Sequence, residues 1–194
     1  MRLLVVGDPR SGKTNWCREY VDRRRESGSS IGGILCPAVH NQGQRVGSDP
    51  VDLLSGQEVP FARLSRYESF KGGEVVGDYT ISREAISFAR GAIKRAIESR
   101  CDLVPINEVG PLELGGKGLT PAVELALASS VNTLIVVRSS LREALRRRFP
   151  QYQFVVIADL RQSSSNMPEL TDGKSNEMVT RESHTEGCQA QETR

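Results

Sequence analysis

The sequence has no long hydrophobic run. Its apolar residues occur in short stretches, none of which approaches the ~20 residues needed to span a bilayer. The first stretch, LLVV at residues 3–6, ends at a Gly-Asp-Pro turn and is too short for the apolar region of a secretory signal. We therefore expect no membrane segment, and we expect this stretch to form a first core strand.

Metal-binding patterns are scarce as well. The four cysteines include no C-x-x-C pair, and His40 and His184 stand far apart in the sequence. Scattered cysteines of this kind are usually small buried hydrophobic residues in cytosolic proteins. The pattern argues against a zinc site and a disulfide framework, and it favours a cytoplasmic location.

A strong excess of one charge is also missing. Lys and Arg number 26 against 24 Asp and Glu, which gives a net charge of +2, far from the basic balance of a dedicated nucleic-acid binder. Residues 163–194 are polar, acidic and without apolar periodicity, which predicts a disordered tail whose removal leaves folding intact. We therefore expect one globular domain at residues 1–162.

Within that domain, apolar runs alternate with amphipathic segments, which is typical of an α/β fold. All-apolar strands suit a mostly parallel sheet covered on both faces. The expected strands are residues 2–6, 102–106, 132–137 and 153–158, and the expected helices are residues 13–26, 83–99, 121–129 and 143–148. Between residues 32 and 65, short β-like runs separated by NQGQ and SGQ turns predict an antiparallel meander.

Three helix starts have recognisable capping residues. Ser82 precedes a segment with helical apolar spacing and is expected to cap it. Thr120 followed by Pro121 combines a cap with a first-turn proline. Ser140 and Glu143 have the spacing of a capping box.

The strongest motif is GDPRSGKT, which matches the phosphate-loop pattern G-x-x-x-x-G-K-[ST] in full. It stands between an expected strand and an expected helix, as the motif requires. We expect nucleotide phosphates to bind at all of its residues, which are Gly7, Asp8, Pro9, Arg10, Ser11, Gly12, Lys13 and Thr14.

Each residue type that the motif requires has a chemical role. Gly7 and Gly12 permit backbone angles that point N–H groups toward phosphate oxygens. Lys13 supplies a point charge to the β and γ phosphates, and the Thr14 hydroxyl is a hard oxygen ligand for Mg²⁺. Arg10 either adds charge near the phosphates or is a solvated loop residue.

The stretch LVPINE is the candidate for the second half of such a site. Asn107 and Glu108 leave the end of an apolar run, at the edge where open α/β sheets bind ligands. Pro105 is unusual inside a strand, so we expect either a local irregularity or a nitrogen that faces away from a partner strand. Arg138 follows a later strand, where P-loop enzymes often place a residue that senses the γ-phosphate.

Four segments together resemble the THEP-type nucleoside-triphosphatase family, to which the cancer-related nucleoside-triphosphatase is related. They are the phosphate loop, VDLLSGQ, VGDY and NEVGPLEL. The resemblance implies a P-loop fold, a three-layer sandwich with an added antiparallel part. It also implies slow, Mg²⁺-dependent hydrolysis of ATP, GTP and other nucleoside triphosphates, with broad base tolerance.

By this resemblance Glu108 is the base or orienter of the attacking water. Lys13, from the motif, is expected to act on the phosphates, and so is Arg138, from its place after a strand, unless it belongs to a solvated charged face. Glu113 fixes the loop of the motif or the outer metal shell. The family carries aspartate where this chain has Asn107. The predicted metal ligands are therefore Thr14 and Asn107, and we expect weakened Mg²⁺ binding because the negative charge of the aspartate is missing.

Two alternatives stay open at this point. One is a nucleotide-binding regulator with little hydrolysis, which Asn107, Pro105 and the acidic tail favour. The other is a P-loop kinase for a small metabolite, which needs an acceptor pocket. A nucleoside triphosphate is the expected partner in each case, and nucleic acid is not expected.

Overall fold

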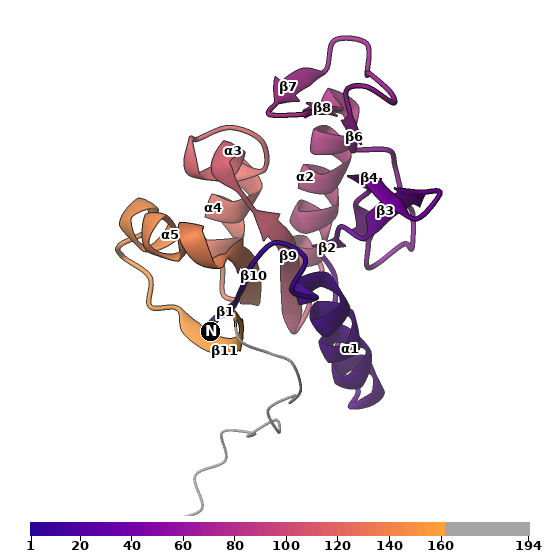
Figure 1. The fold of residues 1–194 in the computed structure, drawn as a ribbon. Coiled ribbons are helices and arrows are strands. Elements are labelled where there is room, and N and C mark those ends of the chain that lie inside the picture. Colours follow the sequence, from indigo (N-terminus) through magenta and orange to yellow (C-terminus); the bar gives the residue numbers. More distant parts are fainter. Residues whose placement is uncertain (162–194) are drawn as a thin grey trace, which may run out of the picture.

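Two β-sheets organise residues 1–161, the part of the chain that the computed structural model describes (Figure 1). The central sheet contains β1 (Arg2–Gly7), β2 (Ile34–Leu35), β5 (Val51–Asp52), β9 (Leu103–Val109), β10 (Asn132–Arg138) and β11 (Val155–Leu160). Its spatial order is β11-β1-β10-β9-β2-β5, and neighbours pair in parallel except β2 with β5. The tail expected at residues 163–194, and its boundary at residue 162, lie outside the described residues.

The second sheet is antiparallel and lies between β2 and the following long helix in the sequence. It contains β3 (Ala38–Asn41), β4 (Gln44–Ser48), β6 (Ala62–Leu64), β7 (Glu74–Val76) and β8 (Tyr79–Ile81), in the order β3-β4-β6-β8-β7. The helices are α1 (Lys13–Glu26), α2 (Arg83–Glu98), α3 (Pro111–Leu114), α4 (Thr120–Ala128), the 3₁₀ turn η1 (Ser139–Leu141) and α5 (Arg142–Arg148). None of these helices is long and apolar enough to cross a bilayer.

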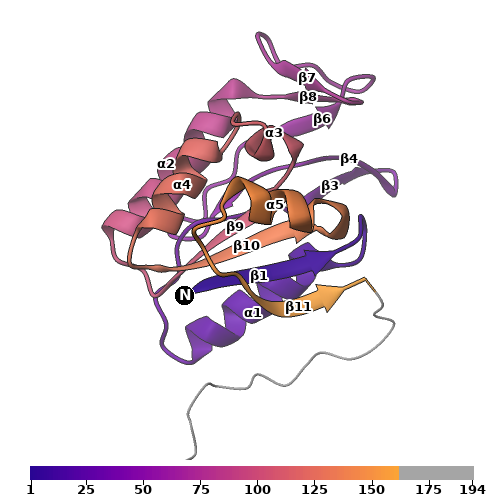
Figure 2. The same ribbon diagram turned by 90° about the vertical axis from the view of Figure 1, so that its left-hand side faces the viewer.

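Successive side chains of the central strands point to opposite faces, and this produces three layers. Leu3 and Val5 of β1 pack with residues of α1, such as Trp16. Leu4 and Val6 pack in the larger cluster with α2 and α4. Figure 2 shows α1 on one side of the sheet and α2 with α4 on the other. The all-apolar strands are thus covered on both faces, as the sequence predicts.

The expected α/β fold with a mostly parallel sheet is confirmed, and α1 spans the expected residues. The cap at Ser82 is confirmed too, since its Oγ accepts a hydrogen bond from the Ala85 backbone N–H at 3.2 Å. The meander prediction is right for β3, β4 and β6, does not include β7 and β8, and is wrong for β2 and β5. Those two-residue strands extend the edge of the central sheet beyond β9.

Two capping predictions are wrong. Thr120 is already the first residue of α4, and its hydroxyl lies within hydrogen-bond distance of the carbonyl oxygens of Glu113 and Lys117, although Pro121 does lie in the first turn as expected. Ser140 lies inside η1, and α5 begins after Leu141 without a side-chain cap. A turn precedes each helix, and the N-cap falls on the residue next to the candidate: Leu119, before Thr120, for α4, and Leu141, after Ser140, for α5.

Candidate active site

The glycine-rich loop closes tightly between β1 and α1. A Cβ atom at Gly7 would lie 2.5 Å from Ser11 Oγ and 2.9 Å from the Cβ of Leu160. Gly12 has a φ of 86°, in the left-handed region that glycine adopts without strain. One glycine therefore allows a close approach, and the other allows the turn into α1.

Lys13 folds back over this loop and is buried. Its Nζ donates to the carbonyl oxygens of Gly7 at 3.0 Å and Asp8 at 2.8 Å. Burial lowers the pKa of Lys13, the Glu108 carboxylate opposes this, and the Arg138 guanidinium adds to it. An ammonium group has three donors, so one is left for a phosphate oxygen.

Thr14 and Asn107 join the loop to β9. Asn107 is buried at the end of the strand, and its Nδ2 donates to the Thr14 hydroxyl at 3.2 Å. The two predicted metal ligands, which are distant in sequence, are therefore in direct contact. With this orientation the amide nitrogen occupies the place where an aspartate would put an oxygen.

Glu108 stands outside the ladder between β9 and β10. Val136 pairs with Asn107, but Val137 pairs with Val109, so the register shifts at Glu108. The peptide bond between Asn107 and Glu108 is cis. The register shift leaves Glu108 without a paired residue on β10, at the end of the strand where the phosphate loop lies.

Arg138 is the residue that contacts Glu108. Its Nε donates to Glu108 Oε1 at 3.2 Å, and a second guanidinium nitrogen lies 3.2 Å from the same oxygen. In the backbone, Arg138 pairs with Gly7 at the end of β10. The structure therefore brings all three residues predicted as catalytic, Lys13, Glu108 and Arg138, to one edge of the sheet.

Glu113 serves the loop after β9. It is buried, and its carboxylate accepts backbone hydrogen bonds from Gly110 at 2.9 Å and Leu119 at 3.0 Å. Burial raises the pKa of Glu113, although both backbone donors oppose the shift. These contacts hold the turn that follows Glu108, in agreement with the loop-fixing alternative expected for Glu113.

The remaining loop residues lie around the same turn. Asp8 Oδ1 accepts a hydrogen bond from the Ser139 hydroxyl. Pro9 and Arg10 are exposed, and Arg10 has a φ of 65°. Within residues 1–161, the buried Ser11 hydroxyl has no hydrogen-bond partner. The Ser139 contact was not predicted, because no sequence signal links η1 to the loop.

Pro105 is accommodated inside β9 by a glycine. The Leu103 carbonyl oxygen accepts a hydrogen bond from the Gly32 backbone N–H at 3.2 Å. Along a parallel strand, every second residue directs its backbone N–H and C=O toward the same neighbouring strand. Pro105, two residues after Leu103, therefore also faces β2. A Cβ atom at Gly33 would lie 2.4 Å from the Pro105 oxygen and 3.2 Å from its nitrogen. The proline nitrogen therefore faces the short strand β2, and the register with β10 stays intact at this residue.

Arg45 of β4 is an exposed charged residue that sequence reasoning did not select. Its charge contributes to lowering the pKa of Lys13, after the larger effects of burial, Glu108, Arg138 and Asp8. The sequence offers no motif that fixes how the second sheet sits on the central one.

The oxygen donors at this edge suit Mg²⁺ bound together with phosphates. Magnesium prefers oxygen ligands, and at nucleotide sites it takes one or two from the protein while phosphates and waters complete the shell. The Thr14 hydroxyl and the Asn107 amide lie side by side, and Glu108 follows directly. These donors fit a metal that shares phosphate ligands. Among the described residues there is no cluster of three or more His, Cys, Asp or Glu that could hold a metal ion.

The family model described as NTPase matches residues 2–169 of the chain. The nucleoside-triphosphatase THEP1 of Methanopyrus kandleri is 31% identical over 174 residues, which cover 88% of this chain and 91% of that protein.

Two solved structures share the fold. The crystal structure of THEP1 from the hyperthermophile Aquifex aeolicus matches with a TM-score of 0.62 at 20% identity, covering 83% of this chain and 90% of that one. The solution structure of a human cancer-related nucleoside triphosphatase matches with a TM-score of 0.60 at 24% identity, covering 80% and 86%.

Proposed function

The chain belongs to the nucleoside-triphosphatase THEP1 family, and we propose that it hydrolyses nucleoside 5′-triphosphates, including ATP and GTP, to the diphosphate and phosphate with Mg²⁺. The observation that carries this proposal is the convergence of Glu108 and Arg138 on the buried Lys13, beside the contact between Thr14 and Asn107. These groups match the needs of phosphoryl transfer, which depends on positioning and on neutralising charge.

In this proposal the loop from Gly7 to Thr14 binds the β and γ phosphates through backbone N–H groups. The N-terminal end of α1 adds a positive partial charge. Lys13 turns one or more of its donors from the carbonyl oxygens of Gly7 and Asp8 to the phosphate oxygens. This exchange is favourable because burial disfavours the uncompensated ammonium.

Thr14 and Asn107 would hold Mg²⁺, which when bound neutralises phosphate charge and fixes the orientation of the phosphate oxygens. Aspartate at position 107 would add a negative charge that the amide lacks. Asn107 instead donates to the Thr14 hydroxyl and so keeps that ligand in place. We infer that metal affinity is reduced and that turnover is slow.

Glu108 orients the attacking water in this scheme. The water oxygen forms a bond to the γ phosphorus, and the bond from that phosphorus to the bridging oxygen breaks, leaving its electron pair on the diphosphate. The proton of the water passes to Glu108. Arg138 holds the Glu108 carboxylate through two nitrogens, and Glu113 holds the turn behind it.

The finer features follow the family resemblance. We propose broad tolerance of the base, one domain at residues 1–162, and a cytoplasmic location. The three cysteines of the described residues, Cys17, Cys36 and Cys101, are free thiols.

A second candidate function is nucleotide binding with little hydrolysis. The ion pair between Glu108 and Arg138 favours it, because a carboxylate engaged by a guanidinium is a weaker base. The missing charge at Asn107 favours it too. In that case the protein reports its nucleotide state to a partner.

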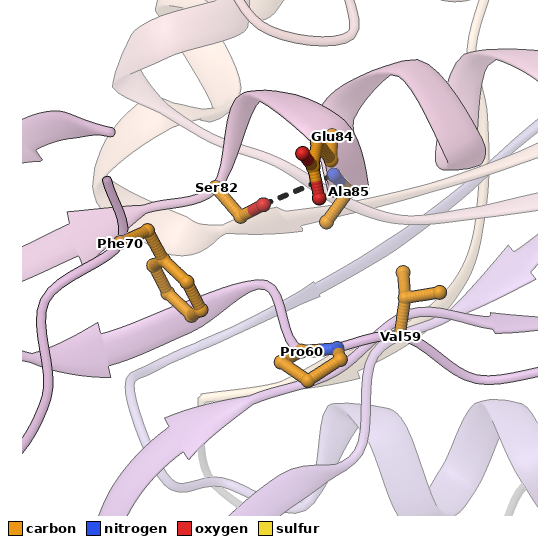
Figure 3. A pocket seen from close by; sticks show the side chains of 6 residues that line it. All are labelled: Val59, Pro60, Phe70, Ser82, Glu84 and Ala85. Carbon is orange, nitrogen blue, oxygen red and sulfur yellow. Dashed lines mark hydrogen bonds between the residues drawn. The ribbon is translucent and has the colours of Figure 1, made fainter. Parts of the chain in front are cut away.

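The kinase alternative requires an acceptor pocket next to the γ-phosphate. A cavity of about 310 Å³ lies between the segment before β6 and the first turn of α2 (Figure 3). It is lined by Val59, Pro60, Phe70, Ser82, Glu84 and Ala85. None of these residues belongs to the phosphate site, so no observation ties this cavity to phosphoryl transfer.

Reaction in ¹⁸O-labelled water tests the proposed function. Hydrolysis places one label in each released phosphate, whereas a kinase transfers the phosphoryl group to another acceptor and releases no labelled phosphate. Nucleotide binding without labelled phosphate would replace the proposal with the second candidate function.

A further inference from the structure

A side-chain hydrogen bond joins the phosphate loop to the end of the neighbouring strand. β1 and β10 lie side by side and pair in parallel as far as Gly7 and Arg138 (Figure 2). One residue further on in each segment, the Ser139 hydroxyl donates a hydrogen bond to the carboxylate of Asp8. Asp8 is the one acidic residue of the loop GDPRSGKT, so η1 holds the only negatively charged side chain of this loop.

The backbone of Asp8 contacts Lys13 at the same time. Lys13 Nζ donates to the Asp8 carbonyl oxygen at 2.8 Å, and the carboxylate of an aspartate is separated from its own carbonyl group by only a few bonds. A rotation of the Asp8 side chain therefore brings the carboxylate within reach of the ammonium. Within residues 1–161, however, the Asp8 carboxylate forms no ion pair with Lys13 or with any other cation. Its hydrogen-bond partner is the neutral hydroxyl of Ser139.

An ion pair between Asp8 and Lys13 would compete with phosphate binding. Opposite charges in contact attract, so Lys13 can offer its donors to phosphate oxygens only when the carboxylate does not take them. Formation of the pair lowers the fraction of the protein that is ready to bind, and the apparent affinity falls by that fraction. A hydroxyl that holds the carboxylate elsewhere removes this competition without adding a charge.

This inference rests on the proposed function, because it requires nucleotide phosphates at Lys13. We propose that Ser139 is a positioning residue for phosphate binding, whose hydroxyl keeps the Asp8 carboxylate from pairing with Lys13. Ser139 acts on the nucleotide through Asp8, and its hydrogen bond leaves the ammonium free for the phosphate oxygens.

A second route from Ser139 to the site runs through Arg138, which directly precedes it and contacts Glu108 at 3.2 Å. A change at Ser139 that displaced Arg138 would disturb the carboxylate that orients the attacking water. Such a disturbance lowers kcat, whereas competition by Asp8 lowers the affinity for the triphosphate. The two routes therefore give different results in binding and in turnover.

The test is a double-mutant cycle with Ser139→Ala and Asp8→Asn, in which the affinity for a β,γ-imido triphosphate with Mg²⁺ is measured. We expect Ser139→Ala to lower this affinity about 5-fold, the size of a partly exposed ion pair. In the Asp8→Asn background the same substitution changes the affinity by less than about 2-fold, because no carboxylate is left to compete. With ATP as the substrate, Ser139→Ala raises KM by a larger factor than it lowers kcat.

Two further variants control for local disruption. Ser139→Thr keeps the hydroxyl and is expected to retain most of the affinity. Ser140→Ala is the matched control, because Ser140 is the next residue of η1, is exposed, and has no side-chain hydrogen bond within the described residues. We expect Ser140→Ala to leave the affinity unchanged. Melting temperatures establish that each variant is folded.

The outcomes separate this inference from the proposed function. An unchanged affinity in Ser139→Ala, or an equal loss with and without the Asp8 carboxylate, would overturn the inference. A fall in kcat alone would overturn it too, because Ser139 would then act through Arg138. If the wild-type protein binds the analogue but releases no phosphate from ATP, the proposed hydrolysis fails, and the cycle still decides the role of Ser139. A wild-type protein that binds no nucleotide would overturn both.

Discussion

Asn107 Nδ2 donates a hydrogen bond to the Thr14 hydroxyl over 3.2 Å, which ties the end of β9 to the first turn of α1. The contact places the second strand of a nucleotide site where the phosphate loop needs it. It also shows what the asparagine changes. The amide contributes a donor at a position where a carboxylate would contribute an acceptor and a negative charge.

Asn107→Asp is predicted to raise Mg²⁺-dependent turnover. A carboxylate accepts a hydrogen bond from the Thr14 hydroxyl and adds a charge near the metal. We expect this to raise kcat several-fold and to lower the Mg²⁺ concentration for half-maximal rate, on the order of 10-fold. Steady-state phosphate release over a Mg²⁺ titration measures both quantities. The control is Asn132→Asp, which makes the same substitution at the first residue of β10, at the other end of the strands from the phosphate loop. No gain at saturating Mg²⁺ would count against the weakened metal side.

Glu108→Gln is predicted to abolish hydrolysis while nucleotide binding persists. The amide still accepts a hydrogen bond from Arg138 but cannot take a proton, so we expect kcat to fall about 100-fold or more. Fluorescent-nucleotide titration and single-turnover rates separate binding from chemistry. Glu143→Gln is the matched control, because Glu143 is an exposed acid paired with Arg146 at 3.3 Å. Equal rates in Glu108→Gln and the control would remove Glu108 from the reaction.

Glu113→Gln is predicted to destabilise the protein in a pH-dependent way. An amide cannot accept both backbone N–H groups, so we expect a loss of about 1–3 kcal/mol in the free energy of unfolding. Burial raises the pKa of Glu113 in the folded state. Its contribution is therefore fully present below the unfolded pKa of about 4.3 and declines as pH rises through the folded pKa.

The free energy of unfolding of the wild type should accordingly exceed that of Glu113→Gln by more at pH 4 than at pH 8. Urea unfolding of both proteins at the two pH values measures the difference. A difference that grows with pH would show that Glu113 is held as a stabilised carboxylate, contrary to the expected effect of burial.

The parts of the fold that were predictable are those with local signals. The loop glycines follow from the motif. The cap of α2 could also be predicted, because it needs only the Ser82 side chain and the backbone N–H of Ala85, three residues later. The strands β2 and β5 were misplaced because a two-residue strand is defined by its partner. The strand β2 pairs with β9, which lies far along the chain, and β5 joins the sheet only through β2.

The residues of the candidate site also divide into those that a local sequence signal marks and those that depend on distant contacts. The sequence identified Lys13 and Glu108, since a motif and a strand end mark them. It could not identify the effect of Arg45 on the pKa of Lys13, because the position of Arg45 depends on a second sheet, which contains the buried pair Asp49 and Arg63. Nor could it show that Arg138 engages Glu108, which depends on the register shift in β9.

Phosphate release from ATP and GTP at saturating Mg²⁺, in wild type and in Lys13→Ala, tests the central claim most directly. The account predicts slow release from both nucleotides by the wild type, reduced at least 100-fold in Lys13→Ala, with melting temperatures compared to confirm that the variant is folded. Equal release by the two proteins, or no release by a wild-type protein that binds nucleotide, would contradict hydrolysis at the phosphate loop.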